Sequence, residues 1–267
     1  MQHKFMQDSL ESAIEFFKVL ENQKRKKILE SCLEGNLLPE QISKILNNSV
    51  MATKKHLNIL QESGLVEKTE NSGFTTTQLG YGCIQNMDSF EFLNRHKNYF
   101  VDHTFGDIPS ELLRMIGNLK NCEFHYGFYL MLPRWSEIIT QAKEYLNLVF
   151  FNPPIIIADS IKPRVDSGLK VRLLVGKNSN ITECNEFVKN LELCNPHPDS
   201  NVEKRRCGEV QVSLIMSESE ACVIFPNNNG ITDMHGNFIS RDPDFVSWCH
   251  DFFEYKWDDG KIISKLS

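Results

Sequence analysis

The chain has 267 residues, of which 41% are hydrophobic and 24% charged, and its formal net charge is −6. This composition is ordinary for a folded soluble protein, and the length suits two domains better than one. No apolar run approaches the ~20 residues that a membrane-spanning helix needs, and the first residues are not followed by the apolar segment of a signal peptide. We therefore expect a cytoplasmic protein without a membrane partner.

The negative charge is unevenly distributed along the chain. Residues 9–80 hold nine Lys or Arg and nine Asp or Glu, whereas residues 81–267 hold nineteen against twenty-five. An acidic chain can still bind DNA, because a local basic face sets the field that the backbone phosphates meet. The balance does argue against broad, sequence-independent coating of nucleic acid.

The cysteines indicate neither disulfides nor a metal centre. None of them forms a C-x-x-C pair, and without a secretory signal we expect the thiols to stay reduced. Cys184, Cys194, His197 and Cys207 share one polar region, but their spacing matches no closed zinc pattern. We expect no metal and no cofactor. The eight cysteines are Cys32, Cys83, Cys122, Cys184, Cys194, Cys207, Cys222 and Cys249.

The N-terminal region predicts several short helices. Apolar residues recur at helical spacing over residues 9–34, where a basic cluster, residues 24–27, is either a solvated face or a contact to the DNA backbone. Pro39 suits the first turn of a helix that continues to Leu46. Asn47 and Asn48 then form a turn, and Ser49 is a good N-cap for the next helix.

The helix that follows Ser49 has one apolar face and one polar face. Thr53, Leu57 and Leu60 follow the i, i+4, i+7 spacing of a buried stripe, and Gly64 predicts the end of the helix. The opposite face carries side chains that can meet phosphates and base edges. These are Met51, Ala52, Lys54, Lys55, Asn58 and Gln61.

After Gly64 the pattern predicts a β-hairpin. Residues 65–68 and 74–79 suit two strands, and residues 70–73 form a turn rich in residues that tolerate positive φ. We therefore predict a winged helix-turn-helix over residues 9–80. A winged helix that serves only protein–protein contacts is the alternative. The residues expected to contact DNA are Ser49, Met51, Ala52, Lys54, Lys55, Asn58, Lys68, Asn71 and Ser72.

Two resemblances support a regulatory role. The segment from His56 to Val66, in which the helix ends at Gly64, resembles the corresponding segment of ArsR/MarR-like regulators. Residues 81–120 read as a helical connector, and the Ile-Pro turn and Ile-Gly-x-Leu ending of residues 100–119 resemble the archaeal methanogenesis-regulatory family. The sequence of residues 236–257 also resembles the methanogenesis-regulatory family. The resemblance implies an archaeal transcriptional regulator with a C-terminal sensor domain.

Residues 121–267 predict a mixed α/β sensor domain. Strand-like segments alternate with amphipathic helices, which favours right-handed crossovers and a largely parallel sheet. This order also resembles the phospholipase D-like domains fused to TrmB-type regulators. Those enzymes use paired H-x-K-x-x-x-x-D motifs, and this chain has none. Such a domain is expected to bind a ligand without cleaving it.

Other catalytic motifs are missing as well. The sequence contains neither a phosphate-binding glycine loop nor a G-x-S-x-G elbow. Asp233 and His235, near Ser240, are the best remaining catalytic candidates, and a hydrogen-bonded polar turn explains them better. We expect no catalytic residues and no enzyme. A metabolite-processing enzyme with a vestigial winged helix is the alternative.

An effector site is expected where the strands of the sensor sheet end. Ligands of open α/β sheets bind beyond the carboxyl ends of the strands, which favours Asn152 and Lys177. Lys177 would suit an anionic metabolite, and His235 and Arg241 are further candidates. We expect a homodimer on double-stranded DNA that responds to an unidentified small-molecule effector, because DNA half-sites related by a two-fold axis suit paired reading heads.

Overall fold

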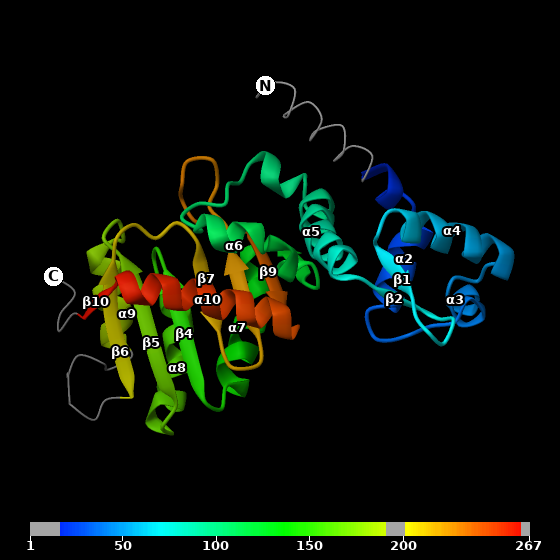
Figure 1. The fold of residues 1–267 in the computed structure, drawn as a ribbon. Coiled ribbons are helices and arrows are strands. Elements are labelled where there is room, and N and C mark those ends of the chain that lie inside the picture. The colour runs from blue at the N-terminus through cyan, green and yellow to red at the C-terminus, as the bar shows by residue number, and fades with distance from the viewer. Residues whose placement is uncertain (1–16, 191–200, 263–267) are drawn as a thin grey trace. The chain divides into compact units, whose positions relative to one another are not determined.

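The computed structural model describes residues 17–190 and 201–262, and the chain divides into two compact units. The first unit is Met1–Asp88 and the second is Ser89–Ser267, so the boundary falls inside helix α5 (Gln78–Arg95). Figure 1 shows the elements of each unit. Within the described ranges, no helix has the length and apolar character needed to cross a bilayer.

The first unit has the element order of a winged helix. Its apolar core contains Ile28, Leu29, Ile42, Leu57 and Leu60, which come from all three helices. Leu10 and Ile14, which the sequence assigned to an early helix, lie outside the described residues. The elements are α2 (Gln23–Ser31), α3 (Pro39–Ile45), α4 (Val50–Glu62), β1 (Val66–Lys68), β2 (Phe74–Thr76) and the first part of α5.

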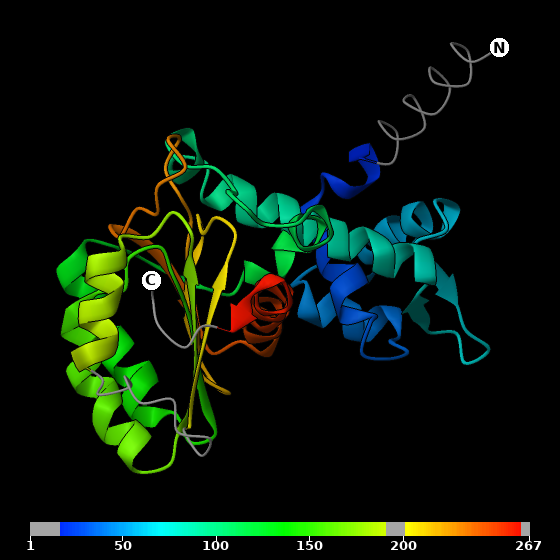
Figure 2. The same cartoon turned by 90° about the vertical axis from the view of Figure 1, so that its left-hand side faces the viewer.

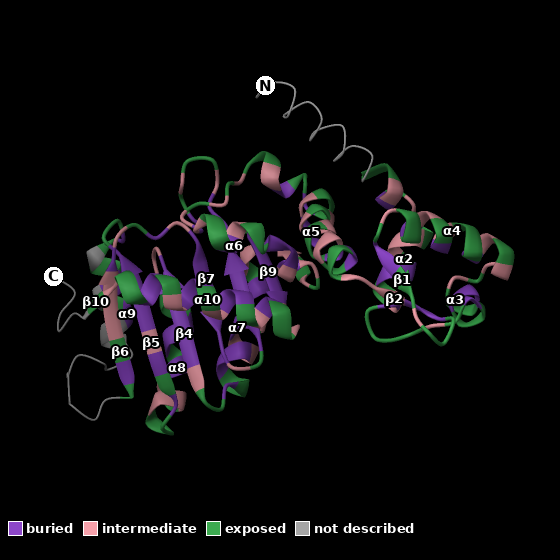
Figure 3. Ribbon diagram, viewed as in Figure 1, coloured by how far each residue is buried: buried purple, intermediate pink, exposed green. Residues whose placement is uncertain are grey.

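The second unit is built on an eight-stranded sheet in the order β10-β6-β5-β4-β7-β8-β9-β3. Figure 3 shows that most of the central strands are buried. The strands are β3 (Glu123–Tyr126), β4 (Tyr145–Phe150), β5 (Lys170–Gly176), β6 (Val202–Cys207), β7 (Ser213–Met216), β8 (Ala221–Ile224), β9 (Gly236–Ser240) and β10 (Lys261–Ile262).

The mixed α/β class is confirmed, but the expectation of a largely parallel sheet is wrong. Only β4–β5 and β5–β6 pair in parallel, and the other five pairings of this sheet are antiparallel. Helices connect β4, β5 and β6, as parallel crossovers require. The four residues 217–220 between β7 and β8 are too few for a crossover, so those two strands form a hairpin.

Helices cover both faces of the sheet (Figure 2). One face packs against α7 (Phe128–Gln141), α8 (Ala158–Asp166) and α9 (Ile181–Asn190). The other packs against α10 (Pro243–Asp259), α6 (Ser110–Arg114) and two short 3-10 helices, η1 (Tyr99–Val101) and η2 (Ile116–Leu119). A further 3-10 helix, η3 (Ile155–Ile157), precedes α8.

Residues 89–120 belong to the core of the second unit. Phe92, Tyr99, Leu112 and Leu119 are buried in the same apolar cluster as α10. Nine of the ring contacts in the second unit involve Tyr99 or Phe100 of this segment, or both. This stretch therefore folds with the sensor sheet.

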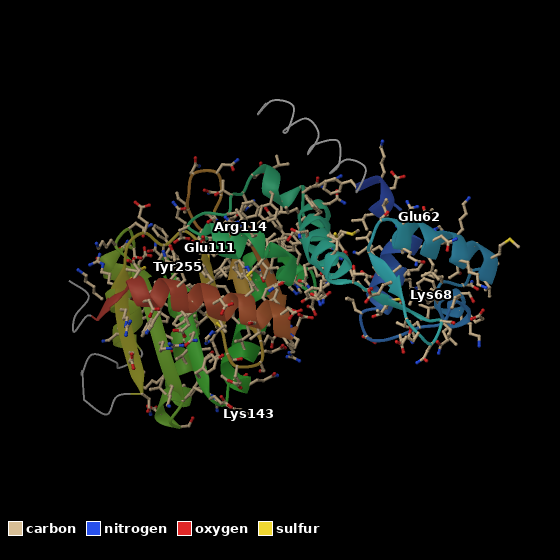
Figure 4. All side chains as sticks on the ribbon, in the orientation of Figure 1. Glu62, Lys68, Glu111, Arg114, Lys143 and Tyr255 are labelled. Carbon is tan, nitrogen blue, oxygen red and sulfur yellow. The ribbon has the colours of Figure 1, made fainter. Side chains whose placement is uncertain are left out.

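The last long helix begins and packs as its sequence predicts. The side chain of Asp242 accepts hydrogen bonds from the backbone N–H groups of Asp244 and Phe245, and Pro243 occupies the first turn. Phe245, Trp248, Cys249 and Phe252 recur at helical spacing and are all buried against the sheet. Tyr255 on the same helix is exposed (Figure 4).

Candidate nucleic-acid interface

The turn between α3 and α4 is fixed by backbone hydrogen bonds. Asn47 adopts φ +47°, a left-handed conformation that Asn tolerates well. This lets the N–H of Asn48 donate to the carbonyl of Ser43 at 2.9 Å and closes the end of α3. Ser49 then caps α4, because its Oγ accepts the N–H of Ala52 at 3.2 Å. Two asparagines and a serine thus set the angle between the two helices.

Helix α4 separates a buried stripe from an exposed face. Thr53, Leu57 and Leu60 are the buried residues of this helix, as the spacing predicted. Gly64 adopts φ +70°, and the N–H of Leu65 donates to the carbonyl of Leu60 at 2.9 Å, which ends the helix. The predicted DNA-contact residues lie on the other side. Met51 is 84% exposed, Lys54, Lys55 and Asn58 are exposed, and Ala52 is partly buried.

The wing is a short hairpin tied to the body of the first unit. Val66 pairs with Thr76 and Lys68 with Phe74. Gly73 leaves room for the side chain of Asn36, because a Cβ would lie 1.9 Å from its Oδ1 atom, which accepts a hydrogen bond from Thr69 at 2.9 Å. The predicted wing contacts Lys68, Asn71 and Ser72 are all exposed, and Figure 4 shows Lys68 on β1.

A group of cations surrounds the middle of α4. Burial and then the positive charges of Arg25, Lys24 and Lys55 lower the pKa of His56 below its ordinary value. The Nδ1 atom of His56 is buried and has no hydrogen-bond partner among the described residues. The N-terminal turn of α2 therefore lies near His56, which is on the side of α4 between the buried stripe and the exposed face. The sequence signal for it was the basic run at residues 24–27, for which a solvated face and a contact to the DNA backbone were the two interpretations.

The four predicted ligand-binding residues lie at the two opposite ends of the strands of the sensor sheet. Asn152 follows β4 and Lys177 follows β5, and the two loops meet where Oδ1 of Asn152 accepts the N–H of Asn180 at 2.9 Å. His235 precedes β9 at the same end of the sheet, and β9 is three strands from β4 in the sheet order. At ~4.8 Å between neighbouring strands, that separation is roughly 14 Å. Asn152 and Lys177 are therefore the only compact pair of the four.

Arg241 follows β9 at the opposite end of the strands. Its Nε donates to Oε2 of Glu220 at 3.0 Å, and Nη2 of Arg134 donates to the other oxygen of that carboxylate at 2.8 Å. The side chain of Glu220 is 2% exposed, so two arginines neutralise a buried charge. Arg241 and Arg134 also line a pocket of about 360 Å³ together with Asn121, Cys122, Glu123, Ile239 and Ser240.

The catalytic candidates Asp233, His235 and Ser240 do not form one site. Asp233 and Ser240 lie at opposite ends of β9, and the Oγ of Ser240 donates to the carbonyl of Asn121. Oδ2 of Asp233 instead bonds Nε2 of His103 at 3.0 Å. Burial opposes ionisation of Asp233, but hydrogen bonds from the backbone of His235 and from His103 lower its pKa overall. This arrangement is a hydrogen-bonded turn.

The position of His103 was missed by sequence reasoning. Its Nδ1 bonds the carbonyl of Tyr99 at 2.8 Å, and its ring stacks on that of Tyr99 at 3.7 Å between centroids. Both ring nitrogens of His103 lie within hydrogen-bond distance of an oxygen atom. His103 thereby ties η1 to the loop before β9. The partners are 130 residues apart in sequence, and no local pattern could have joined them.

The described residues contain no cluster of three or more side chains that could hold a metal ion. Cys184 and Cys207 are free thiols, and burial raises the pKa of each, that of Cys184 to about 11. Cys194 and His197, the other members of the polar group considered for zinc, lie outside the described residues.

Comparison with family models identifies both units. Residues 22–68 match the model described as bacterial regulatory protein, arsR family. Residues 150–259 match the model described as methanogenesis regulatory protein FilR1, middle domain. The chain carries an ArsR-family helix-turn-helix and a FilR1 middle domain. It is thus a DNA-binding regulator of ArsR type with a regulatory middle domain.

Solved structures with similar folds were also found, whereas no curated protein sequence matches the chain. One is the archaeal chromatin protein TrmBL2, with 15% identity, a TM-score of 0.44, and coverage of 90% of this chain and 92% of the other. A second is Nuc, a phospholipase D family member from Salmonella typhimurium, with 13% identity, a TM-score of 0.39, and coverage of 54% and 97%. A third is NucT from Helicobacter pylori, with 12% identity, a TM-score of 0.38, and coverage of 53% and 100%.

Proposed function

We propose that this chain is a sequence-specific transcriptional regulator that binds double-stranded DNA as a homodimer and responds to a small-molecule effector. The observation that carries the proposal is the exposed face of α4, which presents Lys54, Lys55 and Asn58, while the cations of α2 lie near His56 at the side of the same helix. In the proposal α4 enters the major groove, as recognition helices of this type do. Since DNA is the target, the protein would act in the cytoplasm.

Each predicted residue has a role set by its chemistry. Lys54 and Lys55 would neutralise phosphates, and Lys68 with the exposed wing residues Asn71 and Ser72 would contact the flanking backbone. The hydroxyl of Ser49 is occupied as a helix cap, so its role is to position α4.

Base recognition would come from the residues between the lysines. Asn58 can form two hydrogen bonds with adenine, and the side chains of Met51 and Ala52 suit the methyl group of thymine. A site rich in A·T pairs follows from this combination. The polar character of the exposed face supports DNA over a protein partner, since a protein-docking helix would carry an apolar patch.

Fluorescence anisotropy with the DNA upstream of the gene tests the proposal. The change is the double substitution Lys54→Ala and Lys55→Ala, and the matched control is Lys143→Ala. Lys143 is also an exposed lysine and belongs to the second unit, and Figure 4 labels it. The double variant should lose most of its affinity and the control should keep it. Equal binding by all three proteins would contradict the assignment of α4.

For the effector we propose the loops after β4 and β5, because Asn152 and Lys177 lie there together. β4 is also the strand at which the chain changes direction across the sheet, with β5 on one side and β7 on the other, and ligands of open α/β sheets bind at such points. The exposed Lys177 favours an anionic metabolite. Mass spectrometry of molecules that co-purify with the full chain, compared with Lys177→Ala and Lys143→Ala, tests this. An anion retained equally by all three proteins would exclude Lys177.

The proposal treats the second unit as a binding module and not as an enzyme. Its support is that Asp233 and His235, the best catalytic candidates, lie at the opposite end of β9 from Ser240. The cations of Arg134 and Arg241 are likewise engaged by Glu220. The pocket that these arginines line is a second candidate effector site, and it lies at the other end of the strands from Lys177.

A further inference from the structure

The two edges of the sensor sheet are protected very differently. One ends in β10, whose described residues are Lys261 and Ile262. A very short edge strand with a lysine is a common way to prevent edge-to-edge pairing. The other edge is β3, which has four residues and contains neither lysine nor proline. No described residue pairs with the outer side of β3.

The outer side of β3 offers backbone groups in a defined pattern. The N–H of Gly127 donates to the carbonyl of His235, which makes these two a hydrogen-bonded pair of the β3–β9 ladder. Such pairs alternate along antiparallel strands, so His125 and Glu123 also direct their backbone groups toward β9. Phe124 and Tyr126 therefore direct their N–H and C=O groups outward.

The side chains along this edge are unusually exposed for apolar residues. Phe124 packs one side of its ring on Phe238, at 4.9 Å between centroids, yet remains 36% exposed. Tyr126, on the same face of the strand, is 66% exposed, and Tyr129 and Leu130 follow at 86% and 63%. On the opposite face, Glu123 and His125 lie two residues apart, and Oε2 of Glu123 lies 3.0 Å from Nε2 of His125 in a hydrogen bond.

We infer that β3 pairs antiparallel with β3 of a second copy of this chain, with the two Phe124 residues opposite each other on a two-fold axis. Outward-directed residues must pair with outward-directed residues, which limits the symmetric registers to a few. With Phe124 on the axis, Glu123 faces His125 of the second copy twice. Shifting the axis by one residue places Glu123 opposite Glu123 or His125 opposite His125.

Side-chain complementarity therefore selects the register centred on Phe124. The Glu123–His125 pairs fall at non-hydrogen-bonded positions, where Cα atoms approach to ~4.5 Å and a carboxylate and an imidazole can form a hydrogen bond across the pair. Each carboxylate can accept from the imidazole opposite instead of from its own neighbour. The 360 Å³ pocket that Arg241 lines includes Glu123, so it would border this interface.

The inference deepens the homodimer of the proposed function by assigning its interface. The test uses the full chain without DNA, in sedimentation over a range of protein concentrations, and DNA affinity is measured separately. The wild type should be a dimer. His125→Glu places a carboxylate opposite Glu123 of the second copy, so the dimer should weaken by about tenfold or more. An unchanged dimer, or a wild type that stays monomeric, overturns the interface, whatever the DNA affinity.

Two further variants separate charge from misfolding. The double variant Glu123→Lys with His125→Glu reverses both partners and should restore the dimer, which a merely unfolded protein would not do. Lys261→Glu makes a charge reversal at the opposite edge and should leave the dimer intact. Failure of the double variant to recover, or loss of the dimer in Lys261→Glu, contradicts the proposed pairing.

Cysteine cross-linking tests the register itself. Glu123→Cys and His125→Cys proteins are mixed and oxidised, with the wild type as the control for the native thiols. The mixture should form a disulfide-linked heterodimer, since the two Cα atoms would lie within the range that a disulfide spans. Efficient cross-linking of His125→Cys with itself would indicate the register with histidine opposite histidine and overturn the one proposed.

Discussion

Two glycines of α5 should respond in opposite directions to the same substitution. A Cβ at Gly80 would lie 2.2 Å from the backbone carbonyl oxygen of Leu65 and 2.7 Å from the methyl group of Thr76. A Cβ at Gly82 would have nothing within 4 Å. Gly80 thus allows α5 to approach the start of β1, whereas Gly82 has no such role.

The magnitude follows from what must move. Ala is favoured over Gly inside a helix by about 0.8–1.0 kcal/mol, so Gly82→Ala should raise the free energy of unfolding. In Gly80→Ala the contact must open from 2.2 Å to at least 3.0 Å. The obstacle is backbone, and the same Leu65 oxygen accepts the N–H of Thr77 at 3.1 Å. Overpacking of this kind costs about 1–3 kcal/mol, which we expect as the difference between the two variants.

Thermal unfolding of the two variants measures this difference. For a domain of this size, 1 kcal/mol corresponds to about 4–8 °C in Tm. All three tryptophans, Trp135, Trp248 and Trp257, lie in the second unit. Tryptophan fluorescence should therefore stay constant while the circular dichroism transition of the first unit moves. A Gly80→Ala protein as stable as Gly82→Ala would refute the close approach of α5 to Leu65.

Three more predictions concern single contacts. Ser49→Ala removes the cap of α4 and should lower stability by about 1 kcal/mol and weaken DNA binding, whereas Ser49→Asp should keep stability. The Nζ atom of Lys256 lies 2.7 Å from Asp107, and the side chain of Lys256 is 8% exposed. Asp107→Ala would leave Lys256 as an unpaired buried charge, so it should lower the free energy of unfolding by about 3–5 kcal/mol, measured in urea. The pKa of His56 is lowered in the fold, so its contribution to stability is present above pH 6.5 and is lost as the pH falls below that value. His56→Gln should flatten this part of the stability–pH curve, and an unchanged curve would show that His56 does not titrate there.

Local signals were sufficient to predict the helix-turn-helix. The turn at Asn47, the cap at Ser49 and the stop at Gly64 each act within a few residues, and the buried stripe of α4 follows from helical spacing. The same holds for α10, where Asp242 and Pro243 mark the start. In these elements the sequence pattern and the final packing agree because neighbouring residues determine both.

The sheet and its sites depended on contacts that sequence patterns do not encode. Alternating strands and helices suggested a parallel sheet, but β7, β8 and β9 are joined without helices and return antiparallel. Because of this reversal, Arg241 lies at the opposite end of the strands from Lys177. The link between His103 and Asp233 likewise joins segments that meet only after the sheet has formed.

The salt dependence of DNA binding tests the central claim most directly. Each phosphate neutralised by a lysine contributes about −0.9 to the slope of log K against log salt concentration. For the DNA upstream of the gene, the wild-type slope should be steep, and Lys54→Ala with Lys55→Ala should reduce its size by about 1.8. The Lys143→Ala control should keep the full slope. A double variant with an unchanged slope would mean that α4 does not lie against DNA.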